Sequence, residues 1–356
     1  MIKQFNILIL KYAVRVFHII IGTRRCFYFL EELIAAMQNA TQTFITYHCR
    51  PKRAALIRTS SQPMCRLPKL AIVIQGPIIE VDSFTLETVK LYKKHFPNAF
   101  LILSTWSDQK PSLATLFETL GIHVLLNAKP DYAGVSNINL QIVSSKAGVK
   151  KARELGAEYV LKTRTDQRMY ALNIEEYLYN IIQLFPVNAN GCKQDKRIVG
   201  MSMNTFKYRL YGLSDMLLYG HIDDMIMYWD VELDNRRFSN NEMQIAMVSP
   251  RSFVHWRVCE VYLATEFLMK IGRNLEWSLK DSWRVFADHF CVVDKELLDL
   301  YWCKYGFSEF RWKEYEKQIN VFEEMSFKEW LNLYSNQTDY AAPEVILDIP
   351  LERQLI

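Results

Sequence analysis

The stretch EYVLKTRTDQR, residues 158–168, sets charged and hydroxyl side chains directly after a short apolar segment. Its first residues are aromatic, β-branched or aliphatic, and they predict a buried strand over 159–163. Ligands of open α/β sheets bind beyond the carboxyl ends of the strands. Asp166, with Arg164 and Arg168 on either side, would lie at such an end. The stretch therefore predicts a polar ligand site, the alternative being a helix cap or a surface ion pair.

Strand and helix patterns alternate on the amino-terminal side of this stretch and continue briefly after it. We expect strands at 70–77, 99–104, 122–126 and 197–203, and helices at 83–96, 112–120, 137–155 and 173–185. Short connections between alternating strands and helices predict an α/β fold. We expect a mostly parallel, doubly wound sheet with helices on both faces. The last third reads as mostly helical, and residues 345–356 read as a tail or one returning strand.

Composition limits the classes of function. The chain has 356 residues, half of them hydrophobic, which is enough for a sizeable core. The motifs GxGxxG and GxxxxGK[ST] are absent, which disfavours dinucleotide oxidoreductases and Walker-type NTPases. The seven cysteines show no metal-finger spacing and suit a reducing compartment.

Positive charge is concentrated at the amino terminus. Residues 1–68 carry ten Lys or Arg and two acidic residues, whereas the remainder carries 33 basic and 37 acidic residues. A basic head on a mildly acidic body predicts that the head contacts an anionic surface. We expect no nucleic-acid partner, because the body itself is not basic.

Residues 7–21, ILILKYAVRVFHIII, are apolar except for a polar stripe. Lys11, Arg15 and His18 fall at i, i+4 and i+7, on one face of a helix. Cations in the middle of a membrane span are costly, whereas a helix lying in the interface keeps them in water. We expect an amphipathic helix on a membrane surface, with further charge at 24–25. Packing of this helix on its own domain is the alternative.

A family resemblance rests on motifs in fixed order. They are IVIQGP at 72–77, FPN at 96–98, STW at 104–106, NINLQIVSSKAGVKKA at 137–152, YVLKTRTDQR at 159–168 and SDMLLYG at 214–220. With these motifs the chain resembles the WavE lipopolysaccharide synthesis family, which is related to GT-A-type glycosyltransferases. The resemblance implies a bacterial enzyme that moves a sugar from a nucleotide-sugar donor to a lipid-linked lipopolysaccharide-core or capsule acceptor.

The resemblance also implies a domain organisation and a location. We expect a basic extension and linker at 1–68 and a GT-A-like domain at 69–356. Within this domain, 69–203 would bind the nucleotide sugar and 204–356 the acceptor. The acceptor's membrane and the cytoplasmic donor predict a peripheral protein on the cytoplasmic face of the bacterial inner membrane.

The expected metal site departs from the wider GT-A pattern. The usual Asp-x-Asp motif is replaced by Arg164-Thr165-Asp166. One carboxylate beside two arginines is a poorer site for Mn²⁺ or Mg²⁺ than two carboxylates. Either Asp166 binds a metal with ligands from elsewhere, or Arg164 and Arg168 neutralise the donor diphosphate.

Sugar transfer requires a stabilised leaving diphosphate, a base for the acceptor proton and a held donor. The residues expected to bind substrate are Gln75, Gly76, Pro77, Trp106, Asn137, Asn139, Gln141, Lys162, Arg164 and Arg168. The candidates for the base are Asp215, Glu260, Asp223 and Asp224, of which Asp215 is preferred and Glu260 second. His221 and His289 are further candidate metal ligands. We expect Asp166 to lie in a surface cleft, where its substitution costs little stability.

Two other classes of function remain open. Incomplete Asp-x-Asp chemistry fits a non-catalytic, membrane-associated assembly protein with a degenerate transferase fold. The alternating pattern also fits a nucleotidyl- or phosphotransferase. Release of nucleoside diphosphate from a nucleotide sugar would favour the glycosyltransferase alone.

Overall fold

The computed structural model describes residues 2–42, 44–45, 48–58, 67–188, 191–239, 242, 249–304, 323–336 and 342–350. The chain forms two compact units, residues 1–50 and residues 51–356.

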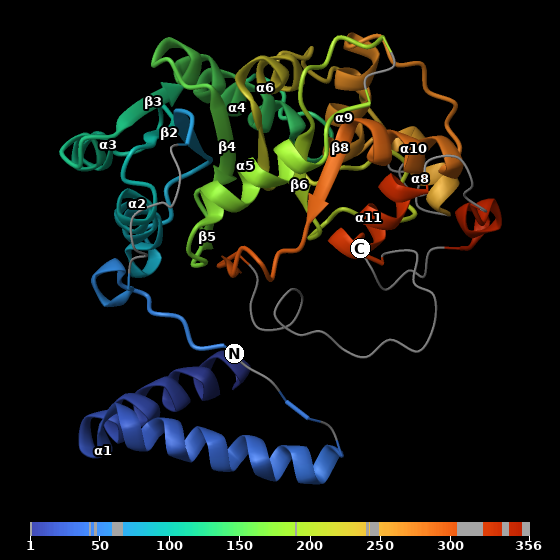
Figure 1. Cartoon of the computed structure of the whole chain (residues 1–356). Coiled ribbons are helices and arrows are strands. Elements are labelled where there is room, and N and C mark those ends of the chain that lie inside the picture. The colour runs from blue at the N-terminus through green and yellow to red at the C-terminus, as the bar shows by residue number, and fades with distance from the viewer. Residues whose placement is uncertain are drawn as a thin grey trace. The chain divides into compact units, whose positions relative to one another are not determined.

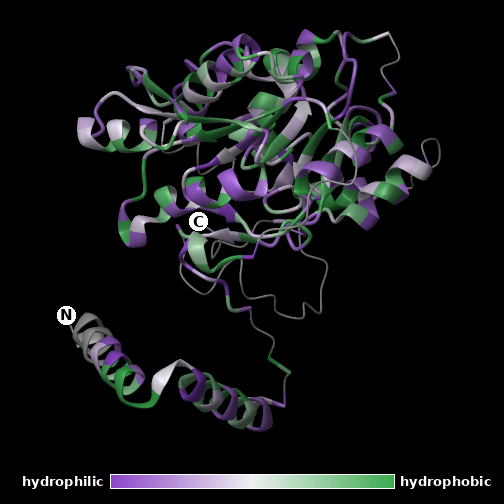
Figure 2. Cartoon of the chain, turned by 60° about the vertical axis from the view of Figure 1, so that its left-hand side comes forward, coloured by the Kyte–Doolittle hydropathy of each residue, from purple (hydrophilic) through white to green (hydrophobic). Residues whose placement is uncertain are grey.

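The first unit is built on one long helix, α1 (Ile2–Thr41), with a break at Gly22. Gly22 has φ 74° and ψ 166°, a conformation that favours glycine. Phe17 and Phe29 are in edge-on contact across this break, with ring centroids 5.4 Å apart. Figure 2 shows the two arms of α1 and the apolar residues along them. Exposed apolar side chains of α1 are Leu10, Tyr12, Val14, Val16, Phe17, Ile19, Ile20, Phe27, Tyr28, Phe29, Leu33 and Met37.

The predicted helix at 7–21 is thus part of α1, and the side chains of its polar stripe at positions 11, 15 and 18 are exposed. In the part of the chain that the structure describes, no helix has the length and apolarity to cross a membrane.

The second unit is organised by a seven-stranded sheet (Figure 1). Its strands are β1 (Leu70–Gln75), β2 (Phe100–Trp106), β3 (His123–Asn127), β4 (Tyr159–Arg164), β6 (Ile198–Met201), β7 (Leu218–His221) and β8 (Phe290–Val293). Their spatial order is β3-β2-β1-β4-β7-β6-β8. Only β7 pairs antiparallel with its neighbours in this sheet of described strands. The prediction of a mostly parallel α/β sheet is confirmed.

The helices of the second unit connect and cover these strands. They are α2 (Phe84–His95), α3 (Pro111–Glu118), α4 (Ile138–Glu154), α5 (Ile174–Leu184), α6 (Ile222–Trp229), α8 (Pro250–Trp256), α9 (Cys259–Lys270), α10 (Leu279–His289) and α11 (Phe327–Ser335). Short 3₁₀ turns lie at Ala54–Leu56 (η1), Val81–Ser83 (η2), Val135–Asn137 (η3) and Glu344–Asp348 (η4).

The chain first winds in one direction from β1 through α2, β2 and α3 to β3, and then returns through α4 to β4 on the far side of β1. Right-handed crossovers in opposite directions place α2 and α4 on opposite faces of the sheet. Helix α4 packs closely on β1, since a Cβ at Gly148 would lie 2.3 Å from a Val73 methyl carbon. The order of the sheet therefore reverses between β1 and β4.

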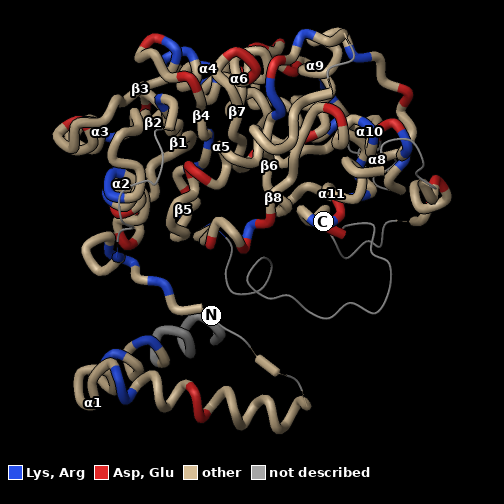
Figure 3. The backbone as a smooth tube through the Cα atoms, viewed as in Figure 1, with Lys and Arg blue, Asp and Glu red and all other residues tan. Residues whose placement is uncertain are grey.

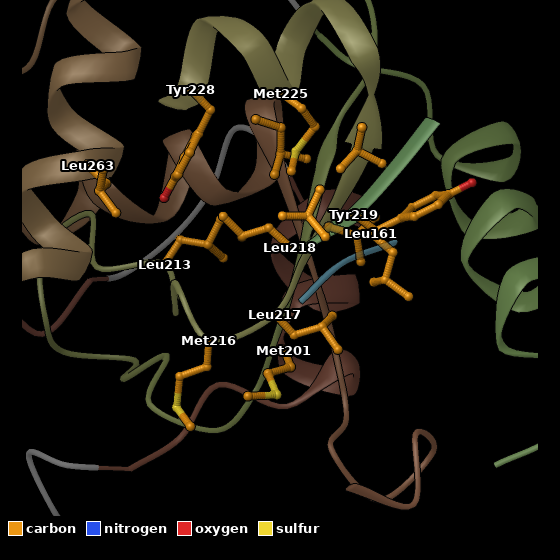
Figure 4. Packing of buried hydrophobic residues seen from close by; sticks show 14 of the residues in the cluster. Leu161, Met201, Leu213, Met216, Leu217, Leu218, Tyr219, Met225, Tyr228 and Leu263 are labelled. Atoms are coloured by element: carbon orange, nitrogen blue, oxygen red, sulfur yellow. The ribbon is translucent and has the colours of Figure 1, made fainter. Parts of the chain in front are cut away.

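Apolar side chains fill the region around β4, β6 and β7. Leu161, Leu218 and Tyr219 are buried there with Met225 of α6 (Figure 4). Tyr159 stacks on Tyr219 across the β4–β7 pair, with ring centroids 5.5 Å apart. This packing holds the central strand rigidly beneath its polar carboxyl end.

Several elements differ from the sequence prediction. Strand β8 lies in the region predicted as mostly helical, and the unpredicted β7 begins in the apolar run before Gly220 and ends at His221. A separate two-stranded ribbon pairs β5 (Gln167–Met169) with β9 (Leu300–Trp302). The returning strand expected at 345–356 is wrong for its described part, which is the 3₁₀ turn η4 and the residues after it. Residues 351–356 lie outside the described chain.

Candidate functional site at the switch point of the sheet

The carboxyl ends of β1 and β4 lie side by side where the strand order reverses. Gln75, the last residue of β1, is the register partner of Arg164, the last residue of β4. The backbone amide of Thr165 donates to the Gln75 carbonyl at 3.0 Å. In open α/β sheets such a reversal opens a crevice that binds ligands.

Gln75 and Arg164 project toward the α4 face. Ser104 is the register partner of Gln75 on β2, and its hydroxyl donates to the Ser144 carbonyl of α4 at 2.7 Å. Partners in register on parallel strands project to the same face, because side chains alternate along each strand. The ends of β2, β1 and β4 thus present Ser104, Gln75 and Arg164 to the amino-terminal half of α4.

Gly76 allows the turns after β1 and β4 to approach each other. Its φ is +124°, and an added Cβ would lie 2.8 Å from Thr165 Oγ1. A side chain at this position would displace the turn that carries Asp166. Pro77, the next residue, is exposed.

Asp166 is held by two partners, and one of them, Arg164, forms an ion pair with it. Arg164 Nε and Nη2 donate to the two carboxylate oxygens at 2.9 and 3.0 Å, and Trp302 Nε1 donates to Oδ2 at 3.0 Å. Burial alone would raise the pKa of Asp166, but the hydrogen bonds from Arg164 and Trp302 lower it. Asp166 is 7% exposed, so the expected surface cleft is wrong for this side chain.

A second acidic group lies on the other side of Arg164. We call it the Asp215 cluster, and it comprises Lys162, Arg209, Asp215, Cys259 and Glu260. Ligand atoms of Asp215, Cys259 and Glu260 lie within 4.8 Å of one another, and all three residues are buried. Lys162 donates to the backbone carbonyl of Asp215 and lies over the Trp229 ring, 5.0 Å from its centroid.

The two carboxylates of the Asp215 cluster differ in their partners. Glu260 accepts hydrogen bonds from Asn204 and from Cys259 Sγ, the latter at 3.2 Å, and lies 3.6 Å from Arg209 Nη1. Asp215 Oδ2 is buried and has no hydrogen-bond partner among the described residues. A buried polar atom without a partner is uncommon in native proteins and is satisfied by water, an ion or a ligand.

Burial and neighbouring charges both act on the pKa values of groups in the Asp215 cluster. Burial raises the pKa of Glu260, and Asp215 raises it further against the opposing effect of Arg209. Burial lowers the pKa of Lys162 to about 8, although Asp215 opposes this shift. Burial and neighbouring charges thus shift the pKa values of two groups in this cluster, as is common at functional sites.

Further unsatisfied polar atoms lie on the α4 side. Gln75 Oε1, Gln141 Oε1 and Ser145 Oγ are buried without a partner in the described part of the chain. Gln75 is 6% exposed and Gln141 is 8% exposed. Gln75 and Gln141 are thus buried acceptors on adjoining elements, as expected of residues that face a bound polar molecule.

Other predicted binding residues serve the fold in this structure. Arg168 is buried, and it donates to Thr88 Oγ1, the Phe84 carbonyl and the Lys52 carbonyl at 2.8–2.9 Å. Asn139 is buried and joins α4 to a loop, donating to the Asp234 carbonyl at 2.8 Å and accepting from its amide at 2.6 Å. Trp106 is buried at the end of β2. Asn137 is exposed before α4 with φ 63°.

The remaining candidates lie away from Asp166. His221 pairs in register with Tyr159, at the amino end of β4, so His221 and Asp223 are at the opposite edge of the sheet. Asp224 is buried and accepts from the amides of Asp195 and Lys196. His289 is buried, its Nδ1 lies 2.7 Å from Gln194 Oε1, and burial lowers its pKa to about 4.

Two groups of acidic residues could hold a metal in the described chain. One is formed by Asp215, Cys259 and Glu260, and the other by Asp195, His221 and Asp223 at the opposite edge. Asp166 belongs to neither group, and its oxygens already accept from Arg164 and Trp302. A hard cation such as Mg²⁺ or Mn²⁺ prefers oxygen ligands, and the buried thiol of Cys259 is a poor partner for it. The residues at Asp166 therefore do not fit a divalent metal in this arrangement.

Sequence reasoning missed Trp302, Cys259 and Arg209. Trp302 is 136 positions from Asp166, in a three-residue strand without a recognisable pattern. Cys259 adjoins the predicted Glu260, and only the fold brings Arg209 to it. No local signal in the sequence identifies these three side chains.

Fold and site together define an α/β protein with a charged, largely buried polar site at the switch point of its sheet. The model of the WavE lipopolysaccharide synthesis family matches residues 70–349. This match extends over well more than half of the chain, and the chain belongs to that family. A search of curated proteins finds no match.

Two solved structures match part of this chain at a low TM-score. One is a putative glucose-1-phosphate thymidylyltransferase from Bacillus anthracis in complex with a sucrose, at 7% identity and a TM-score of 0.29, covering 46% of this chain and 76% of that chain. The other is 4-diphosphocytidyl-2C-methyl-D-erythritol synthase, at 12% identity and a TM-score of 0.29, covering 48% of this chain and 82% of that chain. Similarities at this TM-score carry no argument about function.

Proposed function

We propose that the chain is a GT-A-like glycosyltransferase that moves a sugar from a nucleotide-sugar donor to a lipid-linked lipopolysaccharide or surface-polysaccharide acceptor. Membership of the WavE family supports the pathway. One observation carries the proposal. At the switch point, Gln75 with its buried, unpaired amide oxygen lies beside the charged Arg164 and near the Asp215 cluster.

The donor would occupy the α4 side of this crevice. Gln75 and Gln141 would bind its polar groups with their unpaired amide oxygens, and Gly76 would allow close approach of its backbone. Arg164 would stabilise the leaving diphosphate, which gains negative charge as the bond from its oxygen to the anomeric carbon breaks. Residues 69–203 would thus bind the donor, and residues 204–356 would bind the acceptor.

Asp215 would act as the general base. It would take the proton of the acceptor hydroxyl while that oxygen forms its bond to the anomeric carbon and the nucleoside diphosphate leaves. Glu260 is less suited, since its oxygens already have partners. Because Asp215 is only 2% exposed, we expect the residues that cover it to move when acceptor binds.

In this proposal cationic side chains replace a metal at the diphosphate. Lys162, Arg164 and Arg209 lie among three carboxylates, so guanidinium and ammonium donors are already present at the site. Arginine matches phosphate geometry with two parallel hydrogen bonds. We therefore expect donor binding to be insensitive to removal of divalent cations.

A screen of nucleotide sugars by thermal shift, with Mn²⁺ and with chelator, tests the proposal. We expect one donor to raise the melting temperature equally in both conditions and to release nucleoside diphosphate slowly. Binding without any release, even with bacterial lipid-linked acceptors, would favour a non-catalytic assembly protein. Stabilisation by nucleoside triphosphates alone would favour a nucleotidyltransferase.

We further propose that residues 1–25 hold the enzyme on the cytoplasmic face of the bacterial inner membrane. The exposed apolar side chains of α1 and its stripe at Lys11, Arg15 and His18 support a helix in the interface. Alkaline carbonate should release the full chain from membranes. Failure of extraction would indicate a span, and equal solubility of a chain lacking residues 1–25 would remove the role of α1.

A further inference from the structure

A basic hollow lies on the second unit, away from the switch point. It has a volume of about 420 Å³ and is lined by Arg53, Ala54, Ala55, Glu87, Lys90, Lys93 and Lys94. Four of these side chains are cationic and one is anionic. Figure 3 shows Lys and Arg on α2 and on the segment that contains η1, which contacts α2. The hollow therefore favours an anionic occupant.

The single carboxylate does not neutralise the hollow. Glu87 accepts from the Ala54 amide at 2.8 Å and lies 3.2 Å from Lys90 and 3.5 Å from Arg53. One negative charge is thus shared between two cations and a backbone amide. Positive charge remains in excess, and the side chains of Arg53 and Lys90 are 58% and 42% exposed.

The other two lysines keep donors for a ligand. Lys94 donates to the Ala54 carbonyl at 2.8 Å, and Lys93 donates to the Leu120 carbonyl. An ammonium group has three donors, so one backbone carbonyl leaves further donors available. Cations in the last turn also stabilise α2 through its dipole, but this role does not require Arg53, which lies outside the helix.

The wall formed by residues 51–57 is fixed in place. The Pro51 carbonyl accepts from Tyr170 at 2.9 Å, and the Lys52 carbonyl accepts from Arg168 at 2.9 Å. These bonds, with the two to Ala54, attach the segment to α2 and to β5. The hollow is consequently preorganised for binding, which reduces the entropic cost of occupancy.

An exposed apolar residue distinguishes a membrane from soluble phosphate as the occupant. Leu56 of η1 is 71% exposed, and it follows Arg53 and the two alanines of the hollow. An exposed leucine in the same 3₁₀ turn as a residue that lines a basic hollow suits the boundary between lipid headgroups and acyl chains. A site for a soluble anion gains nothing from such a residue.

We propose that this hollow binds the phosphate of anionic phospholipid headgroups and forms a membrane contact separate from α1. Residues 51–57 follow the first unit directly in sequence, so this contact would act on the catalytic unit itself. Two separate contacts would restrict how the catalytic unit is oriented on a bilayer, whereas α1 alone would leave it tethered.

The test is vesicle binding of the full chain without donor or acceptor, so its outcome does not depend on the proposed transfer reaction. Phosphatidylcholine vesicles with and without phosphatidylglycerol are compared by flotation. The variant is Lys90→Gln, Lys93→Gln and Lys94→Gln together. The matched control is Lys150→Gln, Lys280→Gln and Lys328→Gln, three exposed lysines of α4, α10 and α11 with the same change in charge.

We expect the hollow variant to lose binding to anionic vesicles by tenfold or more, up to on the order of a hundredfold, because each lysine near the surface adds about 1 kcal/mol. Binding to neutral vesicles, which rests on α1, should not change. The control should stay within about twofold of wild type on both vesicles, since its lysines do not converge.

Equal losses in the hollow variant and the control would overturn the proposal. So would unchanged binding of the hollow variant to anionic vesicles together with a loss of inorganic-phosphate binding in calorimetry, because that result would identify a site for soluble phosphate alone. Arg53→Gln and Leu56→Ser, both outside α2, test the same site if the triple variant unfolds. Both should weaken anionic-vesicle binding in a chain whose circular dichroism is unchanged.

Discussion

The two acidic centres beside β4 differ in how their carboxylates are satisfied. Asp166 has both oxygens paired with Arg164 and Trp302. Asp215, which is more deeply buried, has an oxygen without a partner in the described chain. A fully paired carboxylate orients its partner, whereas an unpaired one can accept a proton. The comparison assigns positioning of Arg164 to Asp166 and acid–base chemistry to Asp215.

The largest expected effect is on turnover of Asp215→Asn. An amide cannot accept the acceptor proton, so we expect the rate of transfer to fall by roughly 10²–10⁴-fold. The bond from Lys162 goes to the backbone carbonyl of Asp215 and survives the substitution. Glu260→Gln, in the same cluster, should retain more activity. The assignment fails if Glu260→Gln is the more damaging variant in a transfer assay.

The next effect concerns donor affinity. Arg164→Ala removes the cation proposed to contact the diphosphate, and we expect a loss of about 1.5–3 kcal/mol, or on the order of 10- to 100-fold in Kd. Arg153→Ala removes a surface arginine of α4 that pairs with Asp223 at the opposite edge of the sheet. Titration calorimetry should find the control unchanged, and similar losses in both variants would argue for a general electrostatic effect.

Asp166→Asn should lower both activity and stability. It leaves Arg164 without its ion pair in a largely buried setting, which we expect to cost about 1–3 kcal/mol of the free energy of unfolding. Asp223→Asn, which breaks an exposed pair, should cost less than about 0.5 kcal/mol. Urea unfolding measures both. A lowered pKa in the native state means that Asp166 stabilises the wild type at neutral pH and loses this effect as pH falls through that pKa.

The smallest effect is a pH dependence from Lys162. Its native pKa of about 8 lies below the usual value, so the unfolded chain binds more protons between about pH 8 and 10. This group therefore makes the wild type more stable as pH rises through that window. Lys162→Met should be more stable than wild type at pH 7, and its advantage should shrink by on the order of 1 kcal/mol by pH 10. If the difference in the free energy of unfolding between Lys162→Met and wild type stayed constant across this range, the lowered pKa of Lys162 would be contradicted.

The same two centres indicate what sequence reasoning can locate. Strands β1 to β4 were predictable because continuous apolar runs alternate with helices at short intervals. Asp166 and Gln75 follow such strands directly, and strand direction alone brings them to one edge. Strands β7 and β8 have four residues each, and unlike β6 they lie outside the region where strands and helices alternate regularly along the sequence.

Partners contributed from distant segments could not be predicted. Trp302 reaches Asp166 through the β5–β9 ribbon, whose strands have three residues each. Arg168 belongs to the same charged stretch as Arg164, but the turn at 165–166 separates their strands and directs Arg168 toward α2. Spacing of charges along the sequence therefore does not reveal which guanidinium group faces the crevice.

The most direct test of the central comparison is donor binding by Asp215→Asn and Asp166→Asn, titrated side by side with the nucleotide sugar that stabilises the wild type. We predict that Asp215→Asn binds this donor with wild-type affinity while its turnover is lost. We expect Asp166→Asn to bind more weakly, because Arg164 is no longer held in place. Wild-type affinity in Asp166→Asn together with lost affinity in Asp215→Asn would reverse the roles assigned to the two carboxylates.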